Sequence, residues 1–464
     1  MAPAKTLREA YNAANPAEPL QPGDSRYVDC TDVRGDEDTV RKMFKIISYS
    51  DRPTHQLFTG HRGCGKSTEL LRLKKRLEED GFYVVYFAAD KDLDPNDLIY
   101  TDLLLSVARR VVAQTAKDGI DLGDALKTVE TWFSEVIYKE EEWRRVEQEL
   151  KSEAELGLSM PKGVASKLPF IGHVLTRLTE QIKTGDEIKK EIRQRLDSQI
   201  PQLISGLNDL LHRADVEVQR KKQKGVAVIV DNLDRVTNKD LGGGRTSHDA
   251  LFIEHGEQLC ALRCHTIYTV PISMMYGLSA RNLGGIFDRS HVLPMIRSHE
   301  PRAKGGGPSK AGMQKLRDII AQRIDVDALC DPAAVEYFCL ASGGHPRDLM
   351  TLVRSSIEDA DEGSPKPITQ ALARRAEDQL VSAFARMIPE EYFDKLAAVY
   401  ETNKIKKDSD HQKMLFSQSV LEYSSEPEEA ETEKEPWHDV HPAVQRLKSF
   451  REALNERSKL KLES

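Results

Sequence analysis

The run Gly60-His61-Arg62-Gly63-Cys64-Gly65-Lys66-Ser67 constrains the fold of this chain more than any other feature. It fits the pattern G-x-x-x-x-G-K-[ST] at every required position. It also lies between a strand-like run, His55 to Thr59, and a helical run from Lys66 to Glu79. Glycines let backbone N–H groups surround phosphate oxygens, and the positive end of the following helix favours the same negative charge. The pattern therefore predicts a strand, a phosphate-binding loop and a helix within an α/β domain.

The residue types in this loop predict distinct roles toward a nucleotide. Lys66 is expected to reach the β- and γ-phosphates and to serve catalysis, and the Ser67 hydroxyl is expected to ligate Mg²⁺. The other predicted nucleotide-binding residues of the loop and its helix are Gly60, Arg62, Gly63, Cys64, Gly65 and Thr68.

A second buried strand supplies acidic residues for the same site. Val226 to Val230 is continuously apolar and is followed by Asp231-Asn232-Leu233-Asp234. An aspartate at the end of such a strand is where a Mg²⁺-coordinating carboxylate is expected, so Asp231 is predicted to be a metal ligand. Asp234 is a candidate to polarise the attacking water, or alternatively a cap of the next turn. The loop and this strand together predict a protein that hydrolyses a nucleotide.

The nucleotide is expected to be ATP, with Mg²⁺ as its cofactor. The run Asn238-Lys239-Asp240 superficially resembles the guanine-reading signature N-K-x-D. It is one residue short of that signature and follows Asp231 too closely, so a guanine nucleotide is not favoured.

Two further residues are candidates for the chemistry. Thr269 ends a strand-like run expected to neighbour the Asp231 strand, where its hydroxyl can sense the γ-phosphate; alternatively it is an ordinary strand threonine. Arg289 precedes the strand-like His291-Val292-Leu293 and is expected on the rim of the domain. From there it can reach a neighbouring subunit's nucleotide as a catalytic arginine finger, or it can form an ordinary surface salt bridge.

Alternating strands and helices predict an α/β fold with a parallel sheet. We expect a flexible arm over residues 1–26, a P-loop ATPase domain over 27–300, a helical lid domain over 301–382 and a winged-helix-like domain over 383–464. The last assignment rests on two strand-like runs, Val420 to Tyr423 and Trp437 to Val440, that follow helices.

A helical insertion over residues 118–224 interrupts the α/β alternation. It is either a helical hairpin packed on its own domain or an arm that contacts a partner chain or nucleic acid. The second interpretation depends on a basic cluster that closes the insertion, formed by Arg220, Lys221, Lys222 and Lys224. Such a cluster is also typical of a solvated helix end.

Three motifs together resemble the AAA+ and signal-transduction (STAND, NACHT-like) ATPases, in the branch shared with origin-recognition ATPases. They are Gly60 to Ser67, Asp231 to Asp234, and Ser342-Gly343-Gly344-His345-Pro346-Arg347-Asp348-Leu349, followed by the winged-helix pattern. The resemblance implies that Pro346 approaches the adenine and that Arg347 senses the phosphates. It also implies a homo-oligomer that controls an effector in trans, a nuclease or another toxic protein, in antiviral defence.

The chain departs from this family at Asn232, where the most active enzymes carry a glutamate; this departure favours slow turnover and a switch. An alternative function is a DNA-binding ATPase of the initiator or transposition-regulator kind, and a third is a nucleotide-stabilised scaffold. The acidic wing argues against DNA at that module, because its carboxylates repel phosphates. Its acidic residues are Glu426, Glu428, Glu429, Glu431, Glu433 and Glu435.

Composition bounds the remaining function classes. The chain has 67 Lys plus Arg against 75 Asp plus Glu, a formal net charge of −8, which argues against coating of nucleic acid over the whole surface. No run approaches the roughly 18 apolar residues that span a bilayer. The N-terminus lacks the apolar core of a secretory signal, so we expect a cytoplasmic protein without a membrane partner.

Overall fold

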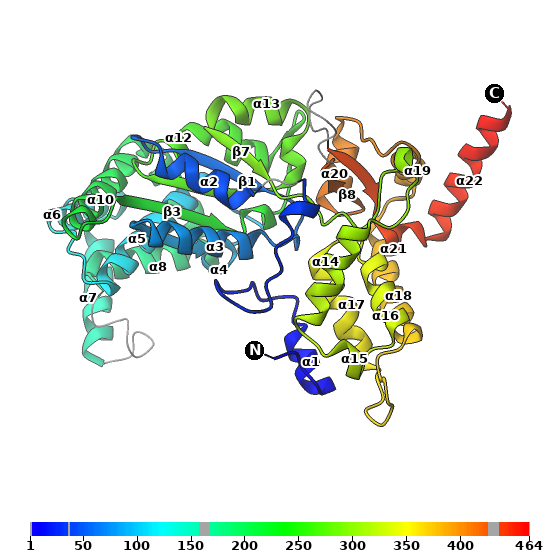
Figure 1. Cartoon of the computed structure of the whole chain (residues 1–464). Coiled ribbons are helices and arrows are strands. Elements are labelled where there is room, and N and C mark those ends of the chain that lie inside the picture. Colours follow the sequence, from blue (N-terminus) through cyan, green and yellow to red (C-terminus); the bar gives the residue numbers. More distant parts are fainter. Residues whose placement is uncertain (1, 36–37, 157–167, 185, 426–435, 464) are drawn as a thin grey trace.

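The computed structural model describes residues 2–35, 38–156, 168–184, 186–425 and 436–463. Its centre is a parallel five-stranded sheet (Figure 1). The strand order is β2 (Phe82–Ala88), β3 (Gly225–Asp231), β6 (His265–Val270), β1 (His55–Thr59) and β7 (Arg289–Val292). The predicted α/β fold with a parallel sheet is confirmed, and β3 and β6 are neighbours as expected.

Helices cover both faces of the sheet, because successive side chains of each buried strand point to opposite faces. Phe58 of β1 packs in the core on the side of α2 (Thr39–Ser48) and α3 (Lys66–Glu79). Leu57 packs in the opposite core, on the side of α5 (Tyr100–Lys117). Two cores on one sheet explain why β2 and β3 are apolar at consecutive positions. The short helices of this domain are η1 (Thr31–Val33), α4 (Ala89–Asp92), η4 (Leu233–Arg235), α11 (Ser247–Asp249), η5 (Ala250–Glu254), α12 (Gly256–Cys260), η6 (Ile272–Met275) and α13 (Gly277–Ile286), with a small hairpin of β4 (Asp240–Gly242) and β5 (Arg245–Thr246).

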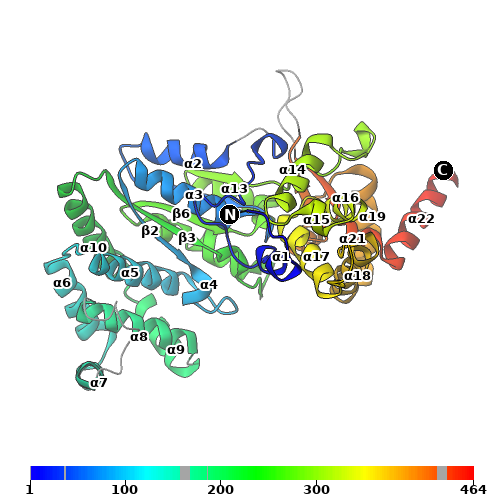
Figure 2. The same ribbon diagram turned by 60° about the horizontal axis from the view of Figure 1, so that its bottom comes forward.

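The insertion forms a helical bundle at the side of the sheet away from the lid (Figures 1 and 2). Its apolar residues join the core of the sheet, as Leu207 and Leu210 do. Pro201 lies in the first turn of the last helix, where its missing N–H costs no hydrogen bond. The arrangement matches a bundle packed on its own domain. The helices are α6 (Asp124–Trp132), η2 (Phe133–Ile137), α7 (Glu140–Leu156), α8 (Phe170–Thr184), α9 (Asp186–Asp197) and α10 (Ile200–Arg220).

A helical lid follows the sheet in the sequence. After η7 (Arg302–Lys304), it contains α14 (Lys310–Ala321), α15 (Val326–Leu329), α16 (Pro332–Ala341), α17 (Pro346–Glu358) and α18 (Gln370–Met387).

The first residues differ from the expected flexible arm. Helix α1 (Leu7–Ala13) begins with a capping box between Thr6 and Glu9 and lies against the lid helix α17. Leu7, Ala10 and Ala14 are buried in the lid core. Alanines carry little hydrophobic signal in a sequence, yet their small side chains let two helices approach closely.

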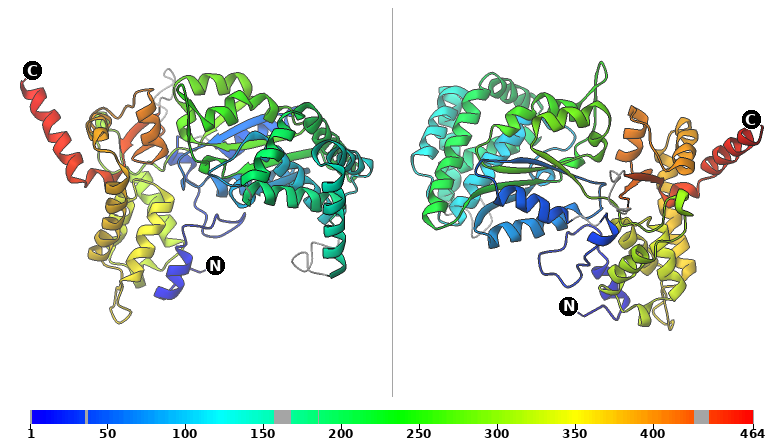
Figure 3. Two further views of the ribbon diagram at one scale, coloured as in Figure 1. Left: turned by 180° about the vertical axis from the view of Figure 1, so that it is seen from behind. Right: turned by 45° about the horizontal axis from the view of Figure 1, so that its top comes forward.

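The C-terminal module has the expected hairpin behind helices. Strands β8 (Val420–Tyr423) and β9 (Trp437–Val440) pair antiparallel, with Val420 opposite Val440. The acidic segment between them, which carries Glu426 to Glu435, lies outside the described residues. The module's helices are η8 (Glu390–Tyr392), α19 (Phe393–Thr402), α20 (Ser409–Phe416), α21 (Pro442–Gln445) and α22 (Lys448–Glu463). Helix α22 extends away from the body of the molecule (Figures 1, 2 and 3).

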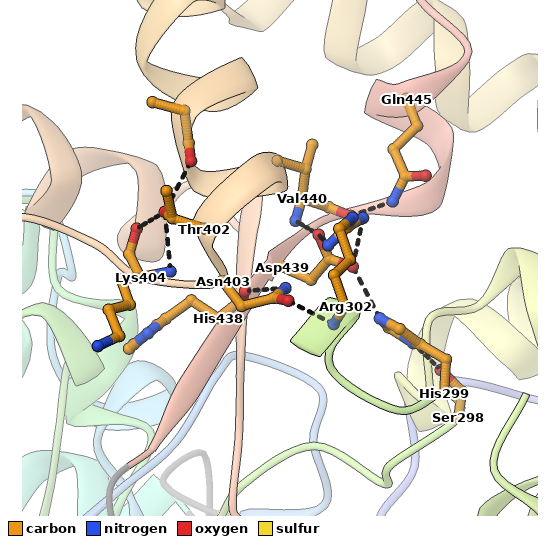
Figure 4. Close-up of polar contacts among 11 residues, drawn as sticks. Ser298, His299, Arg302, Thr402, Asn403, Lys404, His438, Asp439, Val440 and Gln445 are labelled. Atoms are coloured by element: carbon orange, nitrogen blue, oxygen red, sulfur yellow. Dashed lines mark hydrogen bonds and ion pairs between the residues drawn. The ribbon is translucent and has the colours of Figure 1, made fainter. Parts of the chain in front are cut away.

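A buried aspartate fastens this hairpin to the segment that leads into the lid (Figure 4). Asp439 accepts hydrogen bonds from His299 Nε2 at 2.7 Å and from the Arg302 guanidinium at 2.9 and 3.1 Å. The Arg302 backbone N–H donates to Asn403 Oδ1 at 2.7 Å. Charge-assisted hydrogen bonds of this kind are the strong ones in proteins, so the hairpin and the linker are held together.

Candidate functional site

The phosphate-binding loop joins β1 to α3 and depends on glycine at two positions. Gly65 has φ of +110°, in the left-handed region that favours glycine. Gly63 has φ of +87°, and a Cβ built there would lie 2.7 Å from Arg347 Cβ and 2.8 Å from His345 Cε1. A side chain at position 63 would therefore collide with the lid helix, so this glycine serves the close approach of the lid as well as the loop.

Lys66 is buried and fully engaged within the site. Its Nζ donates to the carbonyl oxygens of Gly60 at 2.8 Å and His61 at 2.9 Å, and it pairs with Asp234 Oδ2 at 2.9 Å. Burial by itself lowers the pKa of this ammonium group, but Asp234, together with smaller effects from Cys64 and Asp231, outweighs burial, and the pKa is raised. The lysine therefore stays charged.

Asp231 ends β3 beside Ser67. Its carboxylate accepts hydrogen bonds from the Tyr86 hydroxyl at 2.7 Å and from the Asn232 backbone N–H at 2.7 Å. Burial raises the pKa of Asp231, against the opposing effect of hydrogen bonds from the Ser67 and Tyr86 hydroxyls. Hydroxyl and carboxylate oxygens are the hard ligands that Mg²⁺ prefers, so the Ser67 and Asp231 pair fits the predicted metal.

One cavity of about 720 Å³ brings together most of the predicted residues. It runs between the loop, the end of β3 and the lid, and the first residues of the chain close part of it. The predicted residues on its wall are Arg62, Gly63, Cys64, Gly65, Lys66, Ser67, Thr68, Asp231, Asp234, Pro346 and Arg347. Gly60 is not part of the wall, but its carbonyl holds Lys66.

Pro346 and Arg347 open the lid helix α17 and line the same cavity as the end of β3. Burial and the neighbouring Arg235 guanidinium lower the pKa of Arg347. Arg347 makes no ion pair with any residue that the structure describes. A partly buried guanidinium on the cavity wall is suited to bind phosphate oxygens.

The structure turns Thr269 away from the cavity. Its hydroxyl is buried and accepts a hydrogen bond from the Leu233 backbone N–H at 2.8 Å. Thr269 therefore supports the turn from Asp231 to Asp234, and it is not on the cavity wall.

Arg289 begins the edge strand β7, at the amino end of the sheet. The phosphate-binding loop follows the carboxyl end of β1, so Arg289 lies outside the cavity of its own chain. The side chain is exposed and makes no ion pair within the described part of the chain. The preceding Asp288 pairs instead with Arg52 at 2.9 Å.

Several residues that contact the site belong to no sequence motif, so the sequence alone does not point to them. The Leu20 backbone N–H donates to Thr68 Oγ1 at 3.1 Å, so the segment after α1 crosses the cavity. Arg34 donates to the Cys64 carbonyl at 2.8 Å, and Tyr86 reaches Asp231. An apolar helical spacing at Leu7, Ala10 and Ala14 is the one signal in the sequence that points to an ordered N-terminus.

The lid and the C-terminal hairpin module both contact the phosphate-binding loop directly. His61 Nε2 accepts a hydrogen bond from the Glu422 backbone N–H of β8 at 2.9 Å. The Arg62 carbonyl accepts from His345 Nε2 of the lid at 2.6 Å and from the Gln418 amide. The two residues between Gly60 and Gly63 therefore connect the phosphate-binding loop to the lid and to the hairpin module.

The chain has a parallel α/β fold in which a phosphate-binding loop follows an interior strand of the sheet. The aspartate at the end of β3 and the first residues of the lid helix α17 line the same cavity as this loop. Among the described residues, no helix combines the length and apolar character needed to cross a membrane.

No protein-family model matches the chain, and no curated protein matches it in sequence. Solved structures with a similar arrangement include the Aeropyrum pernix Orc1 protein in complex with DNA, at 14% identity and a TM-score of 0.38, covering 93% of this chain and 94% of that one. The Walker-type ATPase PABY2304 of Pyrococcus abyssi aligns at 12% identity and a TM-score of 0.40, covering 96% and 99%. Cdc6p from Pyrobaculum aerophilum aligns at 10% identity and a TM-score of 0.35, covering 96% and 98%.

Proposed function

We propose that this protein binds ATP with Mg²⁺, hydrolyses it slowly, and acts as a nucleotide-dependent switch that assembles with itself and controls a partner protein. The observation that carries the proposal is the convergence of Lys66, Asp231 and Arg347 on one cavity. These residues come from the loop, from β3 and from the lid, and each has the chemistry that a triphosphate requires. Mg²⁺ held by Ser67 and Asp231 would neutralise phosphate charge.

Slow turnover is supported by the surroundings of Asp231. Asn232, where faster enzymes carry a glutamate, has its side-chain amide bonded to Asp90 at 2.9 Å. Asp234 is the nearby carboxylate suited to polarise water, and it is paired with Lys66. A carboxylate engaged by a lysine is a weaker base than a free one, so we expect a low rate of hydrolysis.

A switch is supported by the contacts of the loop itself. His61 bonds the hairpin module, and Arg62 bonds both the lid and that module. A shift of the loop on nucleotide binding would displace both the lid and the hairpin module, because hydrogen bonds join each of them directly to the loop.

Self-assembly is supported by Arg289, an exposed arginine on an edge strand that lies outside the cavity of its own chain. In this proposal it completes the site of a neighbouring copy. The partner effector and the setting in antiviral defence stay predictions from the sequence resemblance.

DNA binding through the insertion is the alternative, and the basic cluster gives it limited support. Lys224 pairs with Asp80 at 2.8 Å and Arg220 pairs with Glu217 at 2.6 Å, so half of the cluster is neutralised. Lys221 and Lys222 are exposed at the end of α10. Reversal of both lysines to glutamate would abolish duplex binding under the alternative and leave the ATPase assembly unchanged under the main proposal.

The decisive experiment compares ATP hydrolysis by the wild type with that of Lys66→Ala and Asp231→Ala. Lys75→Ala serves as the control, because Lys75 is exposed on the same helix and, among the residues that the structure describes, pairs with Glu79 alone, at 3.7 Å. We expect both site variants to lose hydrolysis and the control to keep it. Equal rates in all four proteins would contradict the proposed enzymatic function and favour a nucleotide-stabilised scaffold. Size measurement with and without ATP tests the assembly.

A further inference from the structure

A tyrosine on the strand next to β3 touches the carboxylate that the metal requires. Strands β2 and β3 run side by side (Figure 2). Tyr86 lies opposite Ile229 and Ala88 lies opposite Asp231. Tyr86 lies on the cavity wall, and its hydroxyl donates to Asp231 Oδ2 at 2.7 Å. Its length lets it reach past Ala88 to the end of the neighbouring strand.

The two oxygens of Asp231 are held by different partners. Oδ2 accepts from Tyr86, and Oδ1 accepts from the Asn232 backbone N–H at 2.7 Å. A carboxylate offers about four lone-pair sites, so these two hydrogen bonds and the one from the Ser67 hydroxyl fix its orientation without filling every acceptor site. The carboxylate is therefore preorganised without being saturated.

The turn after Asp231 is tied to the same part of the fold. Asp90, in α4 directly after β2, accepts from Asn232 Nδ2 at 2.9 Å and from Arg235 at 2.6 Å. Asn232 has φ of +64°, a left-handed conformation that asparagine tolerates better than most residues. The end of β2 and the start of α4 thus anchor the turn at three points, of which Tyr86 alone reaches the predicted metal ligand.

We propose that Tyr86 is a positioning residue that holds the Asp231 carboxylate in the orientation needed to ligate Mg²⁺. The inference rests on the proposed function, since it concerns the metal of that site. It adds a residue that no nucleotide-binding motif contains, and it assigns to β2 a part in metal binding. Without the hydroxyl, the Asp231 side chain keeps the hydrogen bonds from the Asn232 backbone N–H and the Ser67 hydroxyl but loses the one from Tyr86, so it samples more orientations.

The test uses the full chain and the variant Tyr86→Phe, which removes one oxygen atom and keeps the ring. Tyr83→Phe is the matched control, because Tyr83 lies on the same strand and its hydroxyl likewise donates to an aspartate, Asp118, at 2.8 Å, away from the cavity. The readout is the binding of a fluorescent ATP analogue, titrated with Mg²⁺ and repeated in EDTA, with thermal unfolding recorded for each protein.

We expect Tyr86→Phe to raise the Mg²⁺ concentration for half-maximal binding about tenfold, the size typical of losing one hydrogen bond to a charged group. Binding in EDTA stays unchanged, and Tyr83→Phe behaves as the wild type. In an Asp231→Asn background, Tyr86→Phe has no further effect on the Mg²⁺ dependence.

A Mg²⁺ dependence of Tyr86→Phe equal to that of Tyr83→Phe would overturn the inference, and so would an undiminished effect in the Asp231→Asn background. Loss of binding in EDTA as well as in Mg²⁺ would also overturn it, because Tyr86 would then act on the nucleotide or the fold. A wild type that binds the analogue with no Mg²⁺ dependence would contradict the proposed function itself, which is a separate result.

Discussion

Lys66 Nζ lies 2.9 Å from Asp234 Oδ2, and both side chains are buried. The pair joins the phosphate-binding loop to the turn after β3, two elements separated by β6 in the sheet. A phosphate group and Asp234 would compete for the same ammonium group. Nucleotide binding and the availability of a base are therefore linked through one lysine.

Asp234→Asn tests whether this carboxylate polarises water. We expect hydrolysis to fall by about 10²- to 10⁴-fold, the range for loss of a general base, while ATP still binds. Single-turnover hydrolysis and equilibrium binding separate the two effects. Asp240→Asn, on the exposed β4–β5 hairpin, is the control. If hydrolysis persists in Asp234→Asn, the aspartate serves only the turn and its pairing with Lys66.

Arg347→Ala tests the contribution of the lid. Its guanidinium makes no ion pair in the described part of the chain, so its removal leaves no carboxylate unpaired. We expect ATP affinity to fall about 10- to 100-fold, as for loss of a charge-assisted hydrogen bond, with little change in thermal stability. Calorimetric titration measures this change. Arg375→Ala, an exposed lid arginine near Asp359, should bind ATP as the wild type does.

Arg289→Ala tests the predicted arginine finger. In the assembled state we expect hydrolysis to fall by about 10³-fold or more, because a finger supplies positive charge at the transition state. Light scattering would show the assembly intact. The neighbouring Arg52→Ala breaks the pair with Asp288 and should keep activity. Full activity of an assembled Arg289→Ala protein would remove the finger from the mechanism.

Glu422 gives the C-terminal module a pH-dependent stability. Burial raises the pKa of this carboxyl to about 7, against the opposing hydrogen bond from the Tyr276 hydroxyl. The folded state therefore binds the proton more tightly than the unfolded state, whose pKa is near 4.5. Stability from this group is complete below about pH 4.5 and is lost as the pH rises toward 7, by on the order of 1–3 kcal/mol.

Chemical denaturation of Glu422→Gln between pH 4.5 and 8 measures this effect. The amide keeps the side-chain volume and cannot ionise, so the stability of the variant relative to the wild type should increase across that pH range. A difference between the two proteins that stays constant with pH would show that Glu422 does not titrate there.

Local signals in the sequence predict most of the central fold. The phosphate-binding loop, the five parallel strands and helix α17 each follow from consecutive residues, and α17 begins and ends as expected, at Pro346 and Glu358. Asp231 is predictable at the end of its strand, because a carboxylate directly after a continuous apolar run marks the point where a buried strand leaves the core.

The features that the sequence does not predict depend on contacts between distant segments. Tyr86 resembles an ordinary strand tyrosine until β3 lies beside it and brings Asp231, 145 positions later in the chain, within reach of its hydroxyl. For Thr269, the sequence predicts the neighbouring strand but not the rotation of the hydroxyl, which faces Leu233. The sequence of residues 1–26 is rich in Ala and Pro and predicts a flexible arm. Beside Leu7, the buried residues of helix α1 and its C-cap are Ala10 and Ala14, whose contribution depends on the fit of a partner helix.

The N-terminal segment connects the lid to the domain that contains the parallel sheet. Helix α1 is packed on the lid, while Leu20 and Tyr27 are bonded to residues of α3, so a short chain segment spans the mouth of the cavity. Any hinge motion of the lid must stretch or slacken this tether. A protein trimmed to begin at Tyr27 would lose this tether and part of the cavity wall. It would also expose the apolar residues of the lid that α1 covers. We expect it to exchange nucleotide faster than the intact chain.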